Sequence, residues 1–435
     1  MKTLLSFITF FIFLYSSLSA FQVHDQNLVY THPAIIISDG VSYISIQNVP
    51  PGIPIISTEY WTPLLGTAPS TEPGTPSKTE PPTSDSNLSN LTPPEDNLSS
   101  KVIHVDDNAS TGGDGTSWST AHKHLQDALA VAESGDEIWV AEGTYKPDQG
   151  TGKTAGDRAS PFVLVNGVGM YGGFLGTETS RDPLGDNNQT ILSGEIDEDS
   201  ELWSLNVVSG VDLDANTTLD GFRITKGNAN GENGSIYRNG GGMWIQDCEL
   251  RIKNVIFREN NSAYRGGGLY CHTSKSKVLF LTNCLFISNE SVSGGGVYTS
   301  GTSSSFLVIS NCVFTKNRSG SGGGIYCGGI YGSNVIFKNS IFIDNYAGAN
   351  GGAIESLSDS LSLVNCTLIN NSGNTGRGAI YSRSSTNIMT NCILLRNGWS
   401  NSEYVHGFST GSYVSWTSFV IDEGVEAEYP GDPNA

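Results

Sequence analysis

The sequence predicts an all-β fold: a right-handed parallel β-helix solenoid with an N-terminal capping helix, preceded by a small β module and a disordered linker. Two observations predict it. Six copies of Asn-x-x-(Phe/Leu)-x-x-Asn recur at steps of 26 to 29 residues, and a period of this length is typical of solenoids. Glycine runs separate short stretches of β-branched and aromatic residues, which favour strands over helices.

Residues 1–20 have the layout of a secretory signal peptide. Lys2 precedes an apolar run, and the segment ends on Ser-Leu-Ser-Ala, an order typical of a cleaved export signal. We expect cleavage after Ala20 and a secreted or cell-surface location. No later run reaches the roughly 18 apolar residues that a spanning helix needs. We therefore expect no transmembrane segment in the mature chain, which would be free or peripheral to the outer membrane.

Two segments of different composition come before the solenoid. Residues 21–66 contain two β-like runs, at 34–38 and 41–48, and predict a small β module. Residues 67–100 are rich in Pro, Ser and Thr and almost without large apolar side chains. Such a segment cannot offset the entropy of ordering, so we expect an extended linker.

The solenoid itself is predicted over residues 101–424, with its repeats at 240–397 and a tail at 425–435. Near its start, apolar residues at helical spacing are followed by Gly135 as a stop signal and predict one amphipathic helix; they are Leu125, Ala128, Leu129 and Ala132. Residues 137–141 are predicted to form the next strand. The rest of the chain is predicted to be β, in short apolar runs separated by Gly and Asn.

The first Asn of each repeat is predicted to form a structural ladder along the solenoid. Asn tolerates the left-handed turn conformation, and its amide can bond to the copy on the next coil. The ladder comprises Asn254, Asn283, Asn311, Asn339, Asn365 and Asn391.

Alternation along the strands predicts that the residue after the ladder Asn points inward, which places four of the seven cysteines in a buried column. In-register neighbours on parallel strands have parallel Cβ vectors, and this geometry suits a disulfide poorly. We interpret the cysteines as small core residues.

An aromatic column follows the glycine runs. The outward positions hold Trp244, Tyr270, Tyr298, Tyr326 and Tyr381, with Glu355 in the same column. Two interpretations stay open for this predicted exposed sheet. The rings stack on one another and stabilise the sheet, or they form a platform for sugar rings or for a partner protein.

Charge excludes one class of partner and suggests one ion. Asp and Glu outnumber Lys and Arg 43 to 23, for a formal net charge of −20, so we expect no binding to nucleic acid, which requires a basic face. Asp106, Asp107 and Asp114 lie close together beside glycines. They could bind Ca²⁺, the one cofactor we consider, or be simply solvated.

The repeats resemble those of chlamydial polymorphic outer membrane proteins, which pair Phe-x-x-Asn with Gly-Gly-Ala-Ile. Here FREN, FISN and FIDN occur, and GGAI stands at 351–354. DGTSW at 114–118 and GDEIWVAEGTY at 135–145 resemble the leading part of exported right-handed β-helix proteins. These resemblances imply a β-helix at the cell surface or outside it, with a role in adhesion.

The amino-terminal module carries a second resemblance. The pair Tyr60 and Trp61 beside a Pro-Gly segment resembles small chitin- or cellulose-type carbohydrate-binding modules, which implies sugar contacts at both rings. A plain β-hairpin module is the alternative interpretation.

We therefore expect a non-catalytic adhesion or recognition protein that binds a polysaccharide or a cell-surface partner. The outward columns beside the ladder bring no acidic cluster together with a base, as lyase chemistry would require. A pectate-lyase-like polysaccharide lyase or a glycoside hydrolase acting on acidic polysaccharide, and a structural surface-layer component, are the alternatives. An enzyme site would lie within 195–239, whose acidic residues include Glu195, Asp197, Asp199, Asp212, Asp214 and Asp220.

Overall fold

The computed structural model divides the chain into two units, Met1–Asn97 and Leu98–Ala435. It describes residues 101–180, 190–196, 203–301, 306–329, 333–374, 378–384 and 386–397 in full, and elsewhere only the backbone of the strands β1 to β4, β37 and β38. The predicted signal peptide, linker and tail lie outside the described residues.

The amino-terminal unit contains the four strands β1 (Gln22–Val23), β2 (Ile35–Ser38), β3 (Val41–Ser45) and β4 (Trp61–Pro63). Strands β2 and β3 pair antiparallel, as do β3 and β4, so both β-like runs of this segment are strands. Trp61 begins β4, whereas Tyr60 and every side chain of the unit lie outside the described residues. The sugar contacts proposed for this pair stay a prediction.

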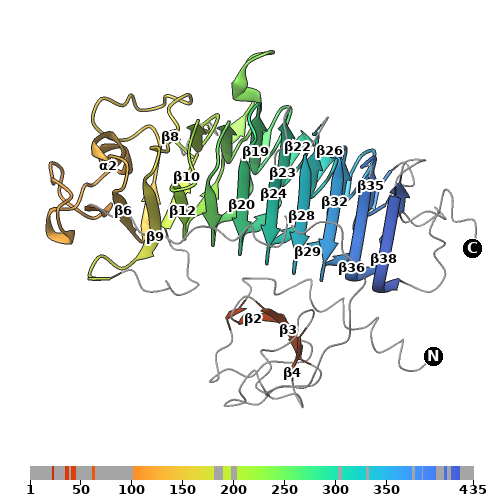
Figure 1. The fold of residues 1–435 in the computed structure, drawn as a ribbon. Coiled ribbons are helices and arrows are strands. Elements are labelled where there is room, and N and C mark those ends of the chain that lie inside the picture. Colours follow the sequence, from red (N-terminus) through yellow and green to blue (C-terminus); the bar gives the residue numbers. More distant parts are fainter. Residues whose placement is uncertain are drawn as a thin grey trace, which may run out of the picture. The chain divides into compact units, whose positions relative to one another are not determined.

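The second unit is a right-handed parallel β-solenoid of about eight turns with very little helix, as the sequence predicts. Strands of successive coils lie side by side along it (Figure 1). Its largest sheet, here sheet 1, has 19 strands. They are β5 (Val102–Val105), β6 (Glu137–Ala141), β7 (Gly143–Tyr145), β9 (Gly169–Phe174), β10 (Thr190–Ser193), β12 (Thr218–Asp220), β13 (Arg223–Thr225), β16 (Arg251–Lys253), β17 (Ile256–Arg258), β20 (Val278–Thr282), β21 (Leu285–Ile287), β24 (Phe306–Ser310), β25 (Val313–Thr315), β28 (Asn334–Lys338), β29 (Ile341–Ile343), β32 (Ser360–Val364), β33 (Thr367–Ile369), β36 (Thr386–Leu395) and β38 (Tyr413–Ile421).

Two further sheets complete each coil. Sheet 2 has nine strands: β8 (Phe162–Val163), β11 (Val208–Val211), β15 (Met243–Gln246), β19 (Leu269–Thr273), β23 (Val297–Gly301), β27 (Ile325–Cys327), β31 (Ile354–Ser356), β35 (Ile380–Ser382) and β37 (His406–Phe408). Sheet 3 has six: β14 (Asn228–Ala229), β18 (Asn261–Ser262), β22 (Glu290–Ser293), β26 (Arg318–Ser321), β30 (Tyr346–Ala347) and β34 (Ser372–Gly373).

The predicted capping helix is present as α2 (Leu125–Val131), and the predicted strand after it is β6. Leu125, Ala128 and Leu129 are buried and join the core of the first coils, so the helix covers the amino-terminal end of that core. Two short 3-10 helices, Trp118–Thr120 and Ile236–Arg238, complete the helical content of the described residues.

Identical core residues stack from coil to coil, which fixes the register of sheet 1. Phe257, Phe286, Phe314 and Phe342 are fully buried neighbours on β17, β21, β25 and β29. Their ring centroids lie 4.7, 4.8 and 4.7 Å apart. A slip of one residue would turn these rings to solvent, so the burial of Phe in four successive coils specifies one register.

The predicted Asn ladder is confirmed. All six residues adopt left-handed backbone, with φ between 49° and 55°. Side-chain amides bond along the column, for example Asn365 Nδ2 to Asn339 Oδ1 at 3.0 Å and Asn391 Nδ2 to Asn365 Oδ1 at 3.2 Å. This outer ladder marks the bend between the two strands that each coil contributes to sheet 1.

A second ladder, formed by the last Asn of each motif, was not predicted. Its members are Asn260, Asn289, Asn317, Asn345, Asn371 and Asn397, all buried. Asn289 is typical: its backbone N–H and its Nδ2 both donate to Asn317 Oδ1 at 3.0 Å, and Nδ2 also donates to the Phe257 carbonyl at 2.9 Å. The inner ladder therefore satisfies its own polar groups inside the core.

The residue before each inner Asn also has left-handed backbone, whatever its side chain. These residues are Glu259, Ser288, Lys316, Asp344, Asn370 and Arg396, with φ between 51° and 55°. Such a conformation is unfavourable for most side chains. The bonds of the inner ladder on the following residue hold the turn in place and compensate for that cost.

All seven cysteines are buried and free, as predicted. Cys284 and Cys312 lie in the inward column after the outer ladder, where the Cys312 Sγ accepts the backbone N–H of Cys284 at 3.4 Å. Burial raises the pKa of Cys271 to about 12, which keeps this thiol protonated and unreactive at neutral pH. No helix among the described residues is both long and apolar enough to cross a membrane.

The span from sheet 2 to the outer ladder varies in length. From the first residue of the sheet 2 strand to the next outer-ladder Asn, three coils span 14 positions (269 to 283, 297 to 311, 325 to 339), and the two that follow span 11 (354 to 365, 380 to 391). In the coils of β19 and β23 the sheet 2 strand is itself longer, with five residues against three in β31 and β35. In the coil of β27 the strand has three residues and the difference lies after it. The strands of sheets 2 and 1 stay in register throughout.

Candidate functional site

Four of the predicted aromatic residues form one stack on the outer face of sheet 2. Trp244, Tyr270, Tyr298 and Tyr326 are direct neighbours on β15, β19, β23 and β27. The Tyr270 and Tyr298 ring centroids lie 5.6 Å apart at 9°, and those of Tyr298 and Tyr326 lie 5.1 Å apart at 6°. We call these four residues the aromatic stack.

The stack is much less exposed than the sequence suggests. Trp244 and Tyr270 are 8% exposed and Tyr298 is 5% exposed, so this part of the sheet is not exposed as expected. The rings stack on one another, and binding by them stays a prediction. Rings one strand spacing apart cover each other's faces. A sugar ring could not lie flat on the middle of such a stack.

Tyr381, the fifth predicted ring, is separated from the stack. On β31 the register places Glu355 between Tyr326 and Tyr381. Tyr381 is 6% exposed, and its hydroxyl accepts a hydrogen bond from Arg383 Nε at 2.7 Å. The structure therefore brings four of the five predicted rings together.

An arginine that the sequence analysis did not identify lies over the stack. Arg265 stands at the corner between sheets 3 and 2, where its backbone bridges Asn239 and Ser293. Its guanidinium carbon lies 4.9 Å from the Tyr298 ring centroid and 4.3 Å from that of Tyr264, a range in which cation–π attraction operates. Its signal was the Tyr-Arg pair directly before a glycine run at 266–268.

The environment of the stack holds the tyrosines in their neutral form. Arg265 Nη2 donates to the Tyr264 hydroxyl at 3.0 Å, and His272 Nδ1 lies 3.0 Å from Ser300 Oγ on the next coil. Burial raises the pKa of Tyr270 and of Tyr298. The stack thus holds neutral tyrosine side chains beside one guanidinium.

Tyr326 is expected to ionise late, and its protonation is linked to stability. Burial, and then the Glu355 carboxylate, raise the pKa of Tyr326 to about 12, against about 10 in an unfolded chain. This contribution to stability is complete below pH 10 and is lost as pH rises through 12.

A pH titration of tyrosinate absorbance tests this pKa. The difference in absorbance between the unchanged protein and Tyr326→Phe should appear with a midpoint near pH 12. In urea the midpoint should fall to about 10; a native value near 10 would contradict the environment described.

The three candidate calcium ligands do not converge. Asp107 Oδ2 accepts the Thr144 backbone N–H at 3.0 Å, and Asp106 Oδ1 accepts that of Asn108 at 2.8 Å. Asp114 bonds to Thr116, and this backbone bond lowers its pKa to about 2. No group of three His, Cys, Asp or Glu side chains among the described residues is arranged to hold a metal ion.

The acidic residues of 195–239 are likewise dispersed. Glu195 forms an ion pair with Lys226 and Asp212 one with Lys275, and Asp220 accepts from Asn254 Nδ2 at 2.7 Å. Asp214 Oδ1 accepts from the backbone of Asn216 at 2.9 Å. Asp197 and Asp199 lie outside the described residues. The described carboxylates of this segment form no paired acid and base.

One protein-family model matches more than half of the chain, within the solenoid. Residues 107–353 match a family model described as a protein of unknown function, DUF1565. The chain belongs to the DUF1565 family. A search of the curated proteins finds no match.

Solved structures similar to this DUF1565 chain are distant in sequence. A pectate lyase, Pel9A, is 12% identical over 76% of this chain and 79% of its own, with a TM-score of 0.42. An alginate lyase from Paenibacillus sp. str. FPU-7 is 13% identical over 74% and 96%, with a TM-score of 0.43. Pectin methylesterase PemA from Erwinia chrysanthemi is 10% identical over 76% and 92%, with a TM-score of 0.33. These likenesses assign no activity to the DUF1565 chain.

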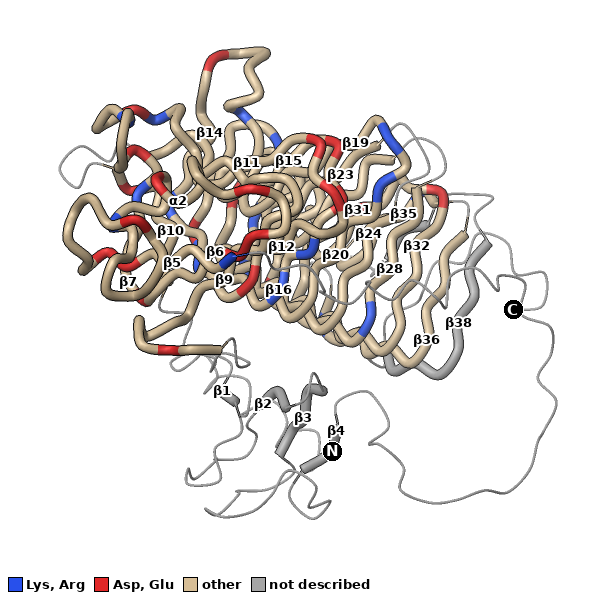
Figure 2. The backbone as a smooth tube through the Cα atoms, turned by 60° about the vertical axis from the view of Figure 1, so that its left-hand side comes forward, with Lys and Arg blue, Asp and Glu red and all other residues tan. Residues whose placement is uncertain are grey.

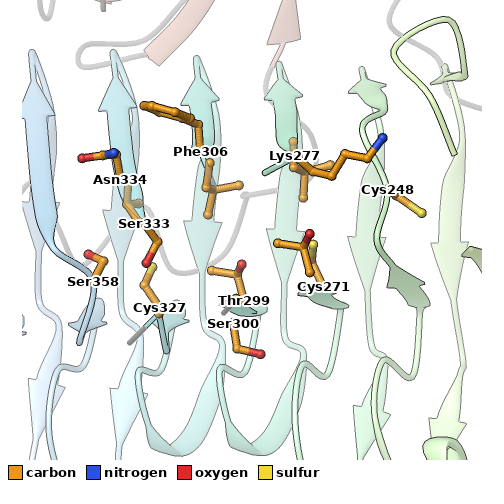
Figure 3. A pocket seen from close by; sticks show the side chains of 16 residues that line it. Cys248, Cys271, Lys277, Thr299, Ser300, Phe306, Cys327, Ser333, Asn334 and Ser358 are labelled. Atoms are coloured by element: carbon orange, nitrogen blue, oxygen red, sulfur yellow. The ribbon is translucent and has the colours of Figure 1, made fainter. Parts of the chain in front are cut away.

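Two cavities of the DUF1565 solenoid are too small for a polymeric substrate. One, of about 20 Å³, lies at the turn between sheets 2 and 1, where Cys271, Thr299 and Cys327 line it from successive coils (Figure 3). The other, of about 90 Å³, lies near α2 and is lined by Lys123, His124 and other residues. The first is lined partly by the residues that follow Tyr270, Tyr298 and Tyr326 on their strands, whereas no residue of the stack lines either cavity.

Proposed function

We propose that this DUF1565 protein is a secreted or surface-exposed, non-catalytic recognition protein that binds an acidic polysaccharide. The single observation that carries the proposal is the Arg265 guanidinium lying over Tyr264 and Tyr298 at the border of sheets 3 and 2. It places a cation among aromatic edges and hydroxyl groups on the outside of the solenoid.

The chemistry of this border suits a carboxylate-bearing glycan. A guanidinium can bond a carboxylate through two parallel N–H groups, and it keeps its charge at every physiological pH. Tyrosine offers an apolar ring with a polar end, which suits the mixed surface of a sugar. Tyr264 is 43% exposed and so is open to a ligand beside Arg265.

Two features of the sequence support a role at the cell surface. The Phe-x-x-Asn and Gly-Gly-Ala-Ile pairs resemble the repeats of chlamydial polymorphic outer membrane proteins, and residues 1–20 resemble an export signal. The repeats suggest adhesion, and the export signal suggests a location outside the cell.

Removing the guanidinium is expected to weaken binding to polygalacturonate or alginate by about tenfold, because one charge-assisted contact is lost. The measurement is affinity electrophoresis of Arg265→Ala against the unchanged protein at low ionic strength. Arg383→Ala is the matched control, since Arg383 also bonds a tyrosine of sheet 2 but lies beyond the stack. Arg265→Lys should restore only part of the affinity.

The stack supplies a second arm of this experiment. A folded Tyr270→Ala/Tyr298→Ala variant should lose the same affinity, because both rings position the guanidinium and its neighbours. Unchanged binding in Arg265→Ala would refute the proposed site. The appearance of unsaturated sugar ends in the incubation, with or without Ca²⁺, would refute the non-catalytic function and favour a lyase.

A further inference from the structure

A second surface, on sheet 1, is more apolar than the aromatic stack. Beyond the outer ladder, the strands β17, β21, β25, β29, β33 and the second half of β36 each point two side chains outward, opposite the buried Phe or Leu between them. One row contains Ile256, Leu285, Val313, Ile341, Thr367 and Ile393, and the other contains Arg258, Ile287, Thr315, Ile343, Ile369 and Leu395. We call these two rows the aliphatic face.

The aliphatic face is unusual for the outside of a protein with a net charge of −20. Figure 2 shows charged residues crowded at the amino-terminal coils, whereas the coils from β20 to β36 carry few. Ile287, Ile343 and Ile369 are partly exposed, whereas Val313, Thr315, Ile341 and Thr367 are at most 5% exposed and form the closely packed middle of the face. Parallel sheets are generally covered on both faces, and contiguous apolar surface marks interaction sites.

A charged column borders this face and has a symmetric order. It consists of the left-handed residues before the inner ladder: Glu259, Ser288, Lys316, Asp344, Asn370 and Arg396. The column has a midpoint between Lys316 and Asp344, which carry opposite charges. At equal distances from this midpoint, Ser288 matches the neutral Asn370. At its two ends Glu259 and Arg396 again carry opposite charges. A surface with this order complements itself when a second copy is inverted.

We propose that the aliphatic face binds a second copy of this chain, through a two-fold axis that runs parallel to the strands between β25 and β29. The two solenoids then run antiparallel. Lys316 faces Asp344 of the second copy, and Glu259 faces its Arg396. A two-fold axis along the solenoid would instead place the charged column opposite the outer Asn ladder, where no charges pair.

The same axis matches the aliphatic rows. Val313 of one copy meets Ile341 of the other, and Ile287 meets Ile369. A two-fold interface always pairs a patch with itself in this way. Ile256 then meets Ile393, while Thr315 meets Ile343 and Leu285 meets Thr367. At the end of the face Arg258 meets Leu395.

The area of the face fits a concentration-dependent dimer. Six strands about 4.8 Å apart and about six residues of about 3.3 Å each cover roughly 29 by 20 Å. This is about 600 Å² per copy and about 1,200 Å² in total, the lower bound of specific interfaces. The face lies on sheet 1 and the proposed glycan site on sheet 2, so each can fail without the other.

The first test is the mass of the full chain by sedimentation equilibrium between about 1 and 200 µM. We expect a reversible dimer that Ile343→Lys weakens by at least about tenfold, because a charge enters the apolar centre. Ser362→Lys, on the outward face of β32 but outside the aliphatic face, is the matched control and should leave the dimer intact, as should Arg265→Ala.

The second test uses the charges and cannot be explained by folding. Lys316→Glu and Asp344→Lys should each weaken the dimer about tenfold, because like charges then meet twice. An equimolar mixture of the two variants should dimerise again. In the mixed dimer the carboxylate introduced at position 316 meets the ammonium introduced at position 344. The unchanged Asp344 of one variant also meets the unchanged Lys316 of the other.

If the unchanged protein is a monomer at all concentrations, the proposal is overturned.

Discussion

Replacing Asn317 by Leu is expected to lower the free energy of unfolding by about 4 kcal/mol, since each buried polar group left without a partner costs about 1–3 kcal/mol. Asn317 Oδ1 accepts from the backbone N–H and the Nδ2 of Asn289, both at 3.0 Å. Its own Nδ2 donates to the Phe286 carbonyl at 2.9 Å and to Asn345 Oδ1 at 3.0 Å. Leucine has a similar volume but leaves these partners unpaired inside the core.

Asn311→Gly is the matched control for the inner ladder. Asn311 belongs to the outer ladder, has left-handed backbone at φ 55° and is partly exposed. Glycine adopts this conformation freely, so the loss should stay below about 1 kcal/mol. Urea unfolding gives the global difference, and amide exchange shows whether the coils around residue 317 open first. Equal losses in both variants would contradict the distinct roles of the two ladders.

Replacing Gly295 by Ala is expected to cost about 3 kcal/mol or to prevent stacking of the coil, because an added methyl group overpacks the core. A Cβ at this position would lie 2.6 Å from both the Arg318 and the Gly323 carbonyl oxygens, and 2.8 Å from the Arg318 nitrogen. All three atoms belong to the backbone of the next coil. No side chain can move aside to relieve the contact.

Gly348→Ala is the matched control within the repeats. The nearest atom to a Cβ there would be the Gly320 Cα at 3.7 Å, an ordinary contact. We expect its stability to change by no more than about 0.5 kcal/mol. The thermal midpoint and circular dichroism of both variants give the comparison. If Gly295→Ala were as stable as Gly348→Ala, close approach of successive coils would not be the reason for the glycine runs.

The repeat period predicted the fold because it is a property of the chain alone. Asn254 and its five equivalents had to align once the coils stacked, and the buried position of residues such as Cys312 followed from alternation along a strand. The same reasoning correctly placed the helix Leu125–Val131 ahead of the repeats.

The candidate site was predicted only in part, because alternation gives the direction of a side chain and not what covers it. Tyr270 and Tyr298 point outward as expected, yet their faces are hidden by their neighbours. Arg265 reaches the stack from a different sheet, a contact that no local pattern contains. The burial of Asn317 was missed because a polar residue in the core is explained only by its partners on other coils.

The 14-position and 11-position spans from sheet 2 to the outer ladder separate two properties of the molecule. Strand pairing sets the rise per coil at about 4.8 Å, and it is the same for long and short spans. Residues gained or lost between these two sheets therefore change the length of one coil without changing the distance between neighbouring coils. New binding loops could be grafted there while the ends of the protein keep their separation.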